Sequence, residues 1–197
     1  MCNVSRVRWT ITPRISPRPW IACSGCGRPR PFHSSGKVRL NANGRKLDAW
    51  LIYRCLDCGR SWNRPLVKRR NVRDIDPIVL AALHFSDPAW VRAQEFDVDG
   101  LRRHTQRVDE FADVTIDRKV CHGMALRGEL VIEIKIALPV SLRLDRLVAA
   151  ELGLSRSKLQ SLHEQGTLVI DPDREGVLRR RVKDGTRIVL KRDDVLM

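Results

Sequence analysis

Two pairs of cysteines impose the strongest constraint on how this chain can fold. Cys23 and Cys26 form one Cys-x-x-Cys pair, and Cys55 and Cys58 form a second pair after 28 intervening residues. Thiolates at this spacing are typical of a four-coordinate zinc site, in which each pair forms a short knuckle. The spacing therefore predicts one Zn²⁺ ion bound by all four cysteines.

The residues between the pairs explain how the two knuckles meet. Residues 38–42 alternate apolar and polar side chains, as a strand does. Asn43-Gly44 then favours a hairpin turn, because both central residues of a type I′ turn have positive φ. Residues 47–54 are rich in aromatic and branched side chains and return the chain to Cys55. This order is the layout of a zinc ribbon.

Zinc and disulfides are competing interpretations of these cysteines. Residues 1–20 carry arginines and no apolar core of 7–15 residues, so no secretory signal is evident, and no apolar run approaches a membrane span. These features indicate a cytoplasmic protein with reduced thiols, which favours zinc. Four protein ligands leave no open position for water, so we expect a structural zinc ion. Gly27 and Gly59 each follow a pair, where a tight knuckle needs positive φ.

The chain is strongly basic, with a formal net charge of +14. Residues 1–75 hold 17 Lys and Arg against 3 Asp and Glu, residues 76–140 hold 8 against 11, and residues 141–197 hold 12 against 9. Such an excess around the cysteines favours a polyanionic partner, nucleic acid first. A solvated basic surface without a partner is the alternative.

A run of cations follows the second cysteine pair. It consists of Arg64, Lys68, Arg69, Arg70 and Arg73. Three aromatic residues lie near it in the sequence: Trp50, Tyr53 and Trp62. Together they can form a phosphate-binding edge with stacking side chains. Alternatively, the aromatic residues form the small core of the ribbon and the cations are solvated. All of these cations except Arg73 are candidate nucleic-acid contacts.

Helices and strands are both predicted in the rest of the chain. Residues 4–12 alternate as a strand. Asp76-Pro77 and Asp87-Pro88 each start a helix with an Asp cap and a proline in the first turn, a third helix is expected over 99–107, and residues 114–138 look extended.

The last third has a different pattern. A helix over residues 142–152 ends at Gly153, and Ser155 caps a second helix that ends at Gly166. Residues 167–170 and 187–190 look like strands. We therefore predict an α+β protein in three parts: a zinc ribbon with basic flanks over 1–75, a helical and then extended linking section over 76–140, and an α/β module over 141–197.

No catalytic constellation is evident. His84, His104 and His122 are scattered, and the middle section has neither a nucleophile–base arrangement nor a glycine-rich phosphate loop. We therefore predict that the protein is not an enzyme.

The C-terminal part resembles the S4-type RNA-binding domain. The resemblance rests on 143–147, 154–158, Gly166 and 182–185, and covers about 50 residues. It implies two helices packed on a small sheet, with a basic helical face that touches RNA backbone. Carried over by position, the implied RNA-facing residues are Arg143, Arg146, Arg156, Lys158 and Lys183.

The whole chain also resembles an uncharacterised bacterial family, domain of unknown function 1062. The resembling stretches are 23–28, 40–44, 50–55 and 61–63. The resemblance implies a fold arrangement with a zinc ribbon and an S4-like module, and it implies no activity.

Three functional hypotheses follow. The first is a zinc-containing protein that binds structured RNA, such as rRNA or tRNA, through both basic parts. The second is a DNA-binding or protein-docking ribbon whose S4-like module is structural only. The third is an RNA-modifying enzyme, which the small middle section and the missing catalytic constellation disfavour.

Overall fold

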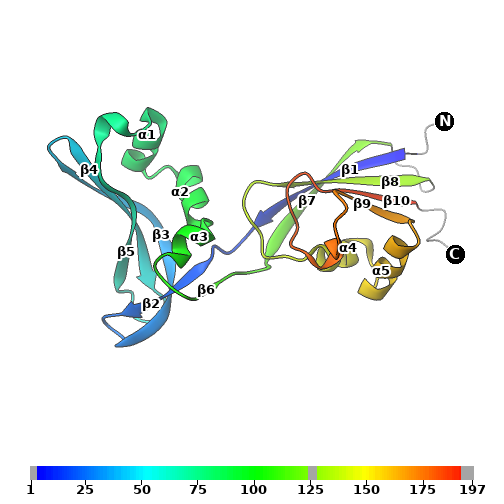
Figure 1. Cartoon of the computed structure of the whole chain (residues 1–197), viewed down its shortest axis with the longest axis horizontal. Coiled ribbons are helices and arrows are strands. Elements are labelled where there is room, and N and C mark those ends of the chain that lie inside the picture. The colour runs from blue at the N-terminus through cyan, green and yellow to red at the C-terminus, as the bar shows by residue number, and fades with distance from the viewer. Residues whose placement is uncertain (1–3, 124–127, 192–197) are drawn as a thin grey trace. The chain divides into compact units, whose positions relative to one another are not determined.

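The computed structural model describes residues 4–123 and 128–191, and the chain forms two compact units. Unit 1 combines residues 1–15 with 111–197, and unit 2 is continuous over 16–110. Each unit contains its own β-sheet and its own helices (Figure 1). The protein is thus of mixed α and β structure, as predicted. No helix in the described ranges is both long and apolar enough to span a membrane.

The sheet of unit 2 is antiparallel throughout. Its strands are β2 (Arg18–Cys23), β3 (Arg28–Asn43), β4 (Lys46–Cys55), β5 (Ser61–Asn71) and β6 (Val108–Asp109). Their order in space is β5-β4-β3-β2-β6. The predicted hairpin is present, but its turn lies one residue later than predicted: Asn43 pairs with Lys46, so Gly44 and Arg45 are the central residues. Of these two, only Gly44 has a positive φ, 59°, so the turn is not of type I′.

Three helices follow β5 and cover one face of that sheet (Figure 1). They are α1 (Pro77–Phe85), α2 (Pro88–Glu95) and α3 (Val98–Arg102), and a short 3-10 turn, η1 (Val72–Asp74), precedes them. Both predicted aspartate caps are confirmed: Asp76 accepts a hydrogen bond from the Ile78 N–H at 2.7 Å, and Asp87 accepts one from the Trp90 N–H at 2.8 Å. The third helix is shorter than the predicted range 99–107, since it spans Val98–Arg102.

The sheet of unit 1 brings the two ends of the described chain together. Its strands are β1 (Val4–Pro13), β7 (Val114–His122), β8 (Glu129–Ile136), β9 (Leu168–Asp171) and β10 (Arg187–Lys191). Their order is β7-β1-β8-β10-β9, in which β1 runs parallel to β8 and antiparallel to β7. The predicted extended stretch 114–138 thus corresponds to two strands, and residues 124–127 lie outside the described residues.

Two helices pack on the sheet of unit 1. These are α4 (Leu144–Leu152) and α5 (Arg156–Glu164), and a 3-10 turn, η2 (Val177–Arg179), lies between β9 and β10. The predicted ends are confirmed: Gly153 is left-handed with a φ of 66°, and Ser155 accepts a hydrogen bond from the Lys158 N–H at 3.1 Å. Leu147, Leu159 and Ile132 are buried in the shared core.

The structure divides the chain at different points from the three predicted parts. The predicted linking section 76–140 is split: α1 to α3 pack on the sheet of unit 2, whereas β7 and β8 belong to unit 1. The apolar faces of these helices pack on the sheet of unit 2. In unit 1, β7 and β8 pair with the two edges of β1. The charge is also shared more evenly than predicted. Unit 2 holds 18 basic and 10 acidic side chains, and unit 1 holds 19 and 13.

Candidate metal centre and basic surfaces

The four cysteines of the two pairs come together at one point in unit 2. Their Sγ atoms all lie within 4.8 Å of one another. The Cys23 and Cys58 sulfurs are 3.3 Å apart, and those of Cys26 and Cys55 are 3.9 Å apart. Cys23 and Cys55 are buried and Cys58 is exposed. The predicted ligand set is therefore assembled, and it can hold a metal ion.

The local backbone explains this convergence. The Gly27 N–H donates to the Cys23 carbonyl at 2.9 Å, and the Gly59 N–H donates to the Cys55 carbonyl at 3.0 Å. The φ angles of these glycines are 67° and 72°, in the left-handed region that a side chain disfavours. The glycine prediction is confirmed.

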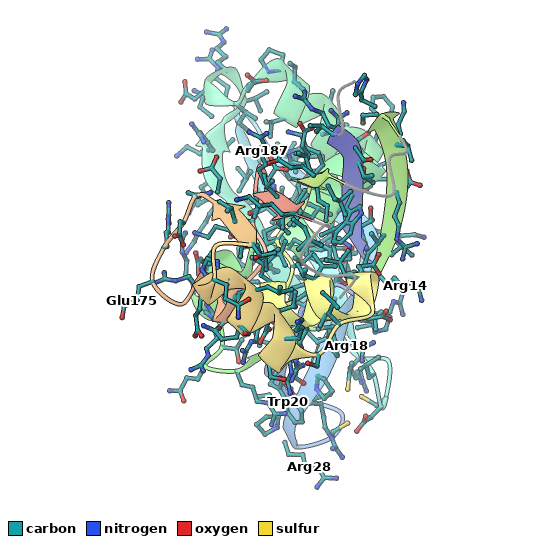
Figure 2. The ribbon with its side chains drawn as sticks, turned by 90° about the vertical axis from the view of Figure 1, so that its right-hand side faces the viewer. Arg14, Arg18, Trp20, Arg28, Glu175 and Arg187 are labelled. Carbon is teal, nitrogen blue, oxygen red and sulfur yellow. The ribbon has the colours of Figure 1, made fainter. Side chains whose placement is uncertain are left out.

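Two contacts join one knuckle to the other. The guanidinium of Arg30 forms an ion pair with Asp57 at 2.8 Å, and the Leu56 N–H donates to the Pro31 carbonyl at 3.1 Å. Arg28, labelled in Figure 2, is exposed just beyond the first knuckle. The cysteine pairs are thus held by the flanking strands as well as by each other.

The thiols differ in acidity. Burial raises the pKa of Cys23, but hydrogen bonds from the Cys58 thiol and from the backbone of Cys26 and Gly25 outweigh it and lower that pKa to about 7. The pKa of Cys26 is raised to about 12, first by its hydrogen bond with Cys58 and then by burial. The negative charge of one thiolate therefore disfavours the deprotonation of the neighbouring thiol. A cation that offsets this charge lets all four act as thiolate ligands.

Two of the sulfur–sulfur distances can be compared with those of a tetrahedral ion. Metal–sulfur distances of about 2.3 Å place the sulfurs of a tetrahedral site about 3.8 Å apart. The two sulfur pairs, at 3.3 and 3.9 Å, lie near that value. Four sulfur donors select soft or borderline metals rather than Mg²⁺ or Ca²⁺.

The candidate contacts on β5 separate into two groups. Arg64 is placed in the interior, with 3% of its side chain exposed, where it pairs with Asp97 at 2.7 Å and donates to the Gln94 carbonyl at 2.6 Å. The expectation that Arg64 contacts nucleic acid is corrected, because β5 turns this residue toward the helices. Three cations are exposed as expected: Lys68, Arg69 and Arg70.

The neighbouring aromatic residues also separate. Tyr53 is buried and its ring lies 5.4 Å from that of Trp62, inside the core of unit 2. Trp50, in contrast, points to the opposite face of β4, since successive side chains alternate along a strand. Tyr53 and Trp62 thus pack in the core of unit 2, and Trp50 is partly exposed on the other face of the sheet.

Only two of the five candidate contacts in unit 1 line the same hollow. Arg143 and Arg156 line one hollow of about 710 Å³, together with Arg179 of η2. Arg146 and Lys158 are exposed but do not line this hollow. Lys183 lines a separate, smaller hollow of about 180 Å³.

Two charged side chains that line the larger hollow, those of Asp145 and Arg179, were not among the predicted contacts. Asp145 accepts two hydrogen bonds from Arg143, at 3.0 and 2.6 Å, and so fixes the plane of that guanidinium. Arg179 enters through η2, a turn that no pattern predicted. The run of three arginines at 179–181 was the available signal for it.

Comparison with known proteins yields one family. The family described as "Protein of unknown function (DUF1062)" matches residues 40–174. No curated protein and no solved structure matches the chain. The matched range includes the second cysteine pair, the helices of unit 2 and most of unit 1. Because it covers 135 of 197 residues, the chain belongs to the family of proteins of unknown function DUF1062.

Proposed function

We propose that this protein binds structured RNA through the arginine-lined hollow of unit 1 and carries a structural zinc ion in unit 2. The observation that supports RNA binding most directly is the convergence of Arg143, Arg156 and Arg179 on one hollow of about 710 Å³. Three guanidinium groups around a cavity of this size suit phosphate groups, which arginine binds with paired N–H donors.

The first turn of α5 adds to this preference for anions. Ser155, Arg156 and Ser157 all line the hollow and stand at the N-terminus of that helix. The N–H groups of a first helical turn carry partial positive charge and have no partner within the helix. A phosphate in the hollow therefore meets backbone donors as well as guanidinium groups.

The packing of helices and strands in this region supports the proposal of an S4-like module. Helices α4 and α5 pack against each other and against an antiparallel part of the sheet, β8-β10-β9. The five basic residues carried over from that resemblance lie on or near these elements. An RNA helix is recognised mainly through its backbone and shape, so a face of arginines and lysines around a hollow suits it.

We propose zinc as the metal because four thiolates in a tetrahedron are the usual structural zinc site. In this proposal, Cys23, Cys26, Cys55 and Cys58 hold the ion and tie the β2–β3 turn to the β4–β5 turn. All four ligands come from the protein, so the ion contributes stability rather than catalysis.

The test compares structured RNA, duplex DNA and heparin at several salt concentrations. Changing Arg156 and Lys158 to glutamate is expected to reduce the preference for an RNA hairpin over heparin, because the altered side chains lie at and beside the hollow. Changing Lys119 and Lys135 to glutamate is the control, since both are exposed on the strands of unit 1 and alter the charge equally. An unchanged preference in the first variant would refute RNA recognition by this face.

The same titrations examine the basic run of unit 2. Each phosphate contact contributes about −0.7 to −0.9 to the slope of log affinity against log salt. Neutralising Lys68, Arg69 and Arg70 is therefore expected to flatten the slope by roughly 2 to 3 for every nucleic acid tested. Equal affinity for duplex DNA and structured RNA would instead favour a DNA-binding ribbon.

A further inference from the structure

The face of the unit 2 sheet opposite the helices carries a cluster of cationic, amide and aromatic side chains. Within the described residues, it holds a depression of about 640 Å³ on β3, β4 and β5. Its lining includes Asn41, Lys46, Trp50, Lys68 and Arg69. We call this surface the Trp50 face.

Strand pairing builds the Trp50 face. Trp50 stands between Arg39 on β3 and Pro65 on β5, its partners in the two ladders. Lys46 lies four residues before Trp50 on β4, so both side chains project from the same face of the strand. Arg39 and Lys46 are exposed and Trp50 is partly exposed.

A bulge in β5 adds two more cations. Leu47 pairs with Arg70 and Ala49 with Val67, so Asp48 stands opposite both Lys68 and Arg69. Arg69 has a φ of 46°, and its N–H donates to the Asp48 carboxylate at 2.8 Å. A bulge of this kind re-aims side chains at the edge of a ladder. Both Lys68 and Arg69 are exposed as a result.

The side chains of the Trp50 face suit the binding of a single nucleic-acid strand. Its four cations, Arg39, Lys46, Lys68 and Arg69, outnumber the single carboxylate of Asp48, which is already bound to the bulge. An indole ring stacks on any nucleobase, and asparagine amides can bond base edges. No helix lies on this face to enter a DNA major groove in the described part of unit 2.

We propose that the Trp50 face binds unpaired nucleic acid, with a base stacked on Trp50 and phosphates contacting Arg39, Lys46, Lys68 and Arg69. This inference rests on the proposed function and extends it. The hollow of unit 1 takes structured RNA, and the Trp50 face takes a single-stranded segment.

The experiment measures binding of fluorescent oligouridine and of an RNA hairpin to the full chain and to Trp50 variants. Trp50→Leu is expected to weaken oligouridine binding roughly 5- to 100-fold, because each stacked base contributes strongly to affinity. Trp50→Phe keeps an aromatic ring and is expected to restore most of that loss. The salt dependence stays unchanged in both variants, because indole carries no charge.

A charge variant and a control complete the test. Lys46→Gln with Lys68→Gln is expected to flatten the oligouridine salt slope by about 1.4, at about 0.7 per phosphate contact on a single strand. Lys37→Gln is the control, since Lys37 is exposed on β3 but does not line the depression. Ultraviolet crosslinking of oligouridine to the wild-type chain needs no substitution, and it is expected to modify Trp50 or its neighbours.

The outcomes separate the two proposals. In one outcome, hairpin binding depends on Arg156, but oligouridine binds Trp50→Leu and wild type with equal affinity and forms no crosslink on β3 to β5. That outcome overturns the inference about the Trp50 face and leaves the proposed function in place. Absence of binding to both nucleic acids overturns the proposed function and this inference with it. Equal weakening of oligouridine and heparin by Trp50→Leu also overturns the stacking role, because heparin has no bases.

Discussion

Removing the carboxylate of Asp97 tests the interior position of Arg64. The Arg64 guanidinium lies 2.7 Å from the Asp97 carboxylate, and its side chain is only 3% exposed. Asp97 also caps α3, because its other oxygen accepts a hydrogen bond from the Gly100 N–H at 2.9 Å. Asp97→Ala therefore leaves a buried cation without its counter-ion and a helix without its cap.

The expected cost follows from these two losses. An uncompensated buried charge costs about 3–5 kcal/mol, but 45% of the Asp97 side chain is exposed, so water can replace part of the interaction. We therefore expect about 2–3 kcal/mol from the ion pair and about 1 kcal/mol from the cap. The total of about 3–4 kcal/mol is a large part of the 5–15 kcal/mol that stabilises a typical domain.

Urea unfolding monitored by tryptophan fluorescence measures this cost. Four of the five tryptophans lie in unit 2, so the signal reports mainly on that unit. Asp99→Ala is the matched control: Asp99 also lies in α3 and pairs with Arg102 at 3.6 Å, but its side chain is 89% exposed. We expect the control to change the free energy of unfolding by less than about 0.5 kcal/mol.

Two further variants sharpen the test. Arg64→Met in the Asp97→Ala background removes the stranded charge and is expected to recover about 2 kcal/mol. Gly100→Ala keeps both partners, but its Cβ would overlap the Asp97 carboxylate and the Arg64 guanidinium, so it too should destabilise unit 2. A cost for Asp97→Ala no larger than that of Asp99→Ala, or a double variant no more stable than Asp97→Ala, would refute the buried pair.

Three other predictions follow from the structure. Metal analysis should find one zinc ion per chain, and a strong chelator should unfold unit 2 while leaving the transition of unit 1 in place; zinc-free protein with an unchanged transition would contradict the metal site. Burial raises the pKa of Tyr53 to about 12, above the value of 10.0 expected in an unfolded chain, so folding favours the neutral phenol and this contribution is complete below pH 10. Wild type should therefore lose about 2 kcal/mol more stability than Tyr53→Phe as the pH rises from 10 to 12, as measured by urea unfolding at each pH. Deleting residues 1–13 should abolish the cooperative unfolding of unit 1, observed by circular dichroism, because β1 is an interior strand of its sheet; a preserved transition would contradict that topology.

Local signals predicted much of the secondary structure. Asp76, Asp87 and Ser155 each cap a helix through a hydrogen bond within three residues of itself. The two cysteine pairs are brought together by a single hairpin, the β3–β4 hairpin, which turns at Gly44. These features depend on the residue and its immediate neighbours, and for that reason a sequence pattern can reveal them.

Long-range pairing accounts for what the sequence did not predict. Nothing in residues 4–13 indicates a parallel partner more than 100 positions later, yet β8 is that partner. The inward position of Arg64 likewise depends on its register opposite Leu51, which two bulges in β5 help to set. Arg179 joins Arg143 and Arg156 only because η2 packs beside α4. Each of these placements is decided by contacts between distant segments.

The interrupted arrangement of unit 1 has a consequence for the order of events during protein synthesis. Ile11 pairs with Ile136, so β1 emerges 125 residues before its parallel partner. At 5–20 residues per second, this strand waits roughly 6–25 s. Unit 2 is continuous, and β2 and β6 join its two ends by pairing Arg18 with Asp109. It can therefore fold completely during the delay, closing the intervening loop and reducing the entropic cost of uniting β1 with β8.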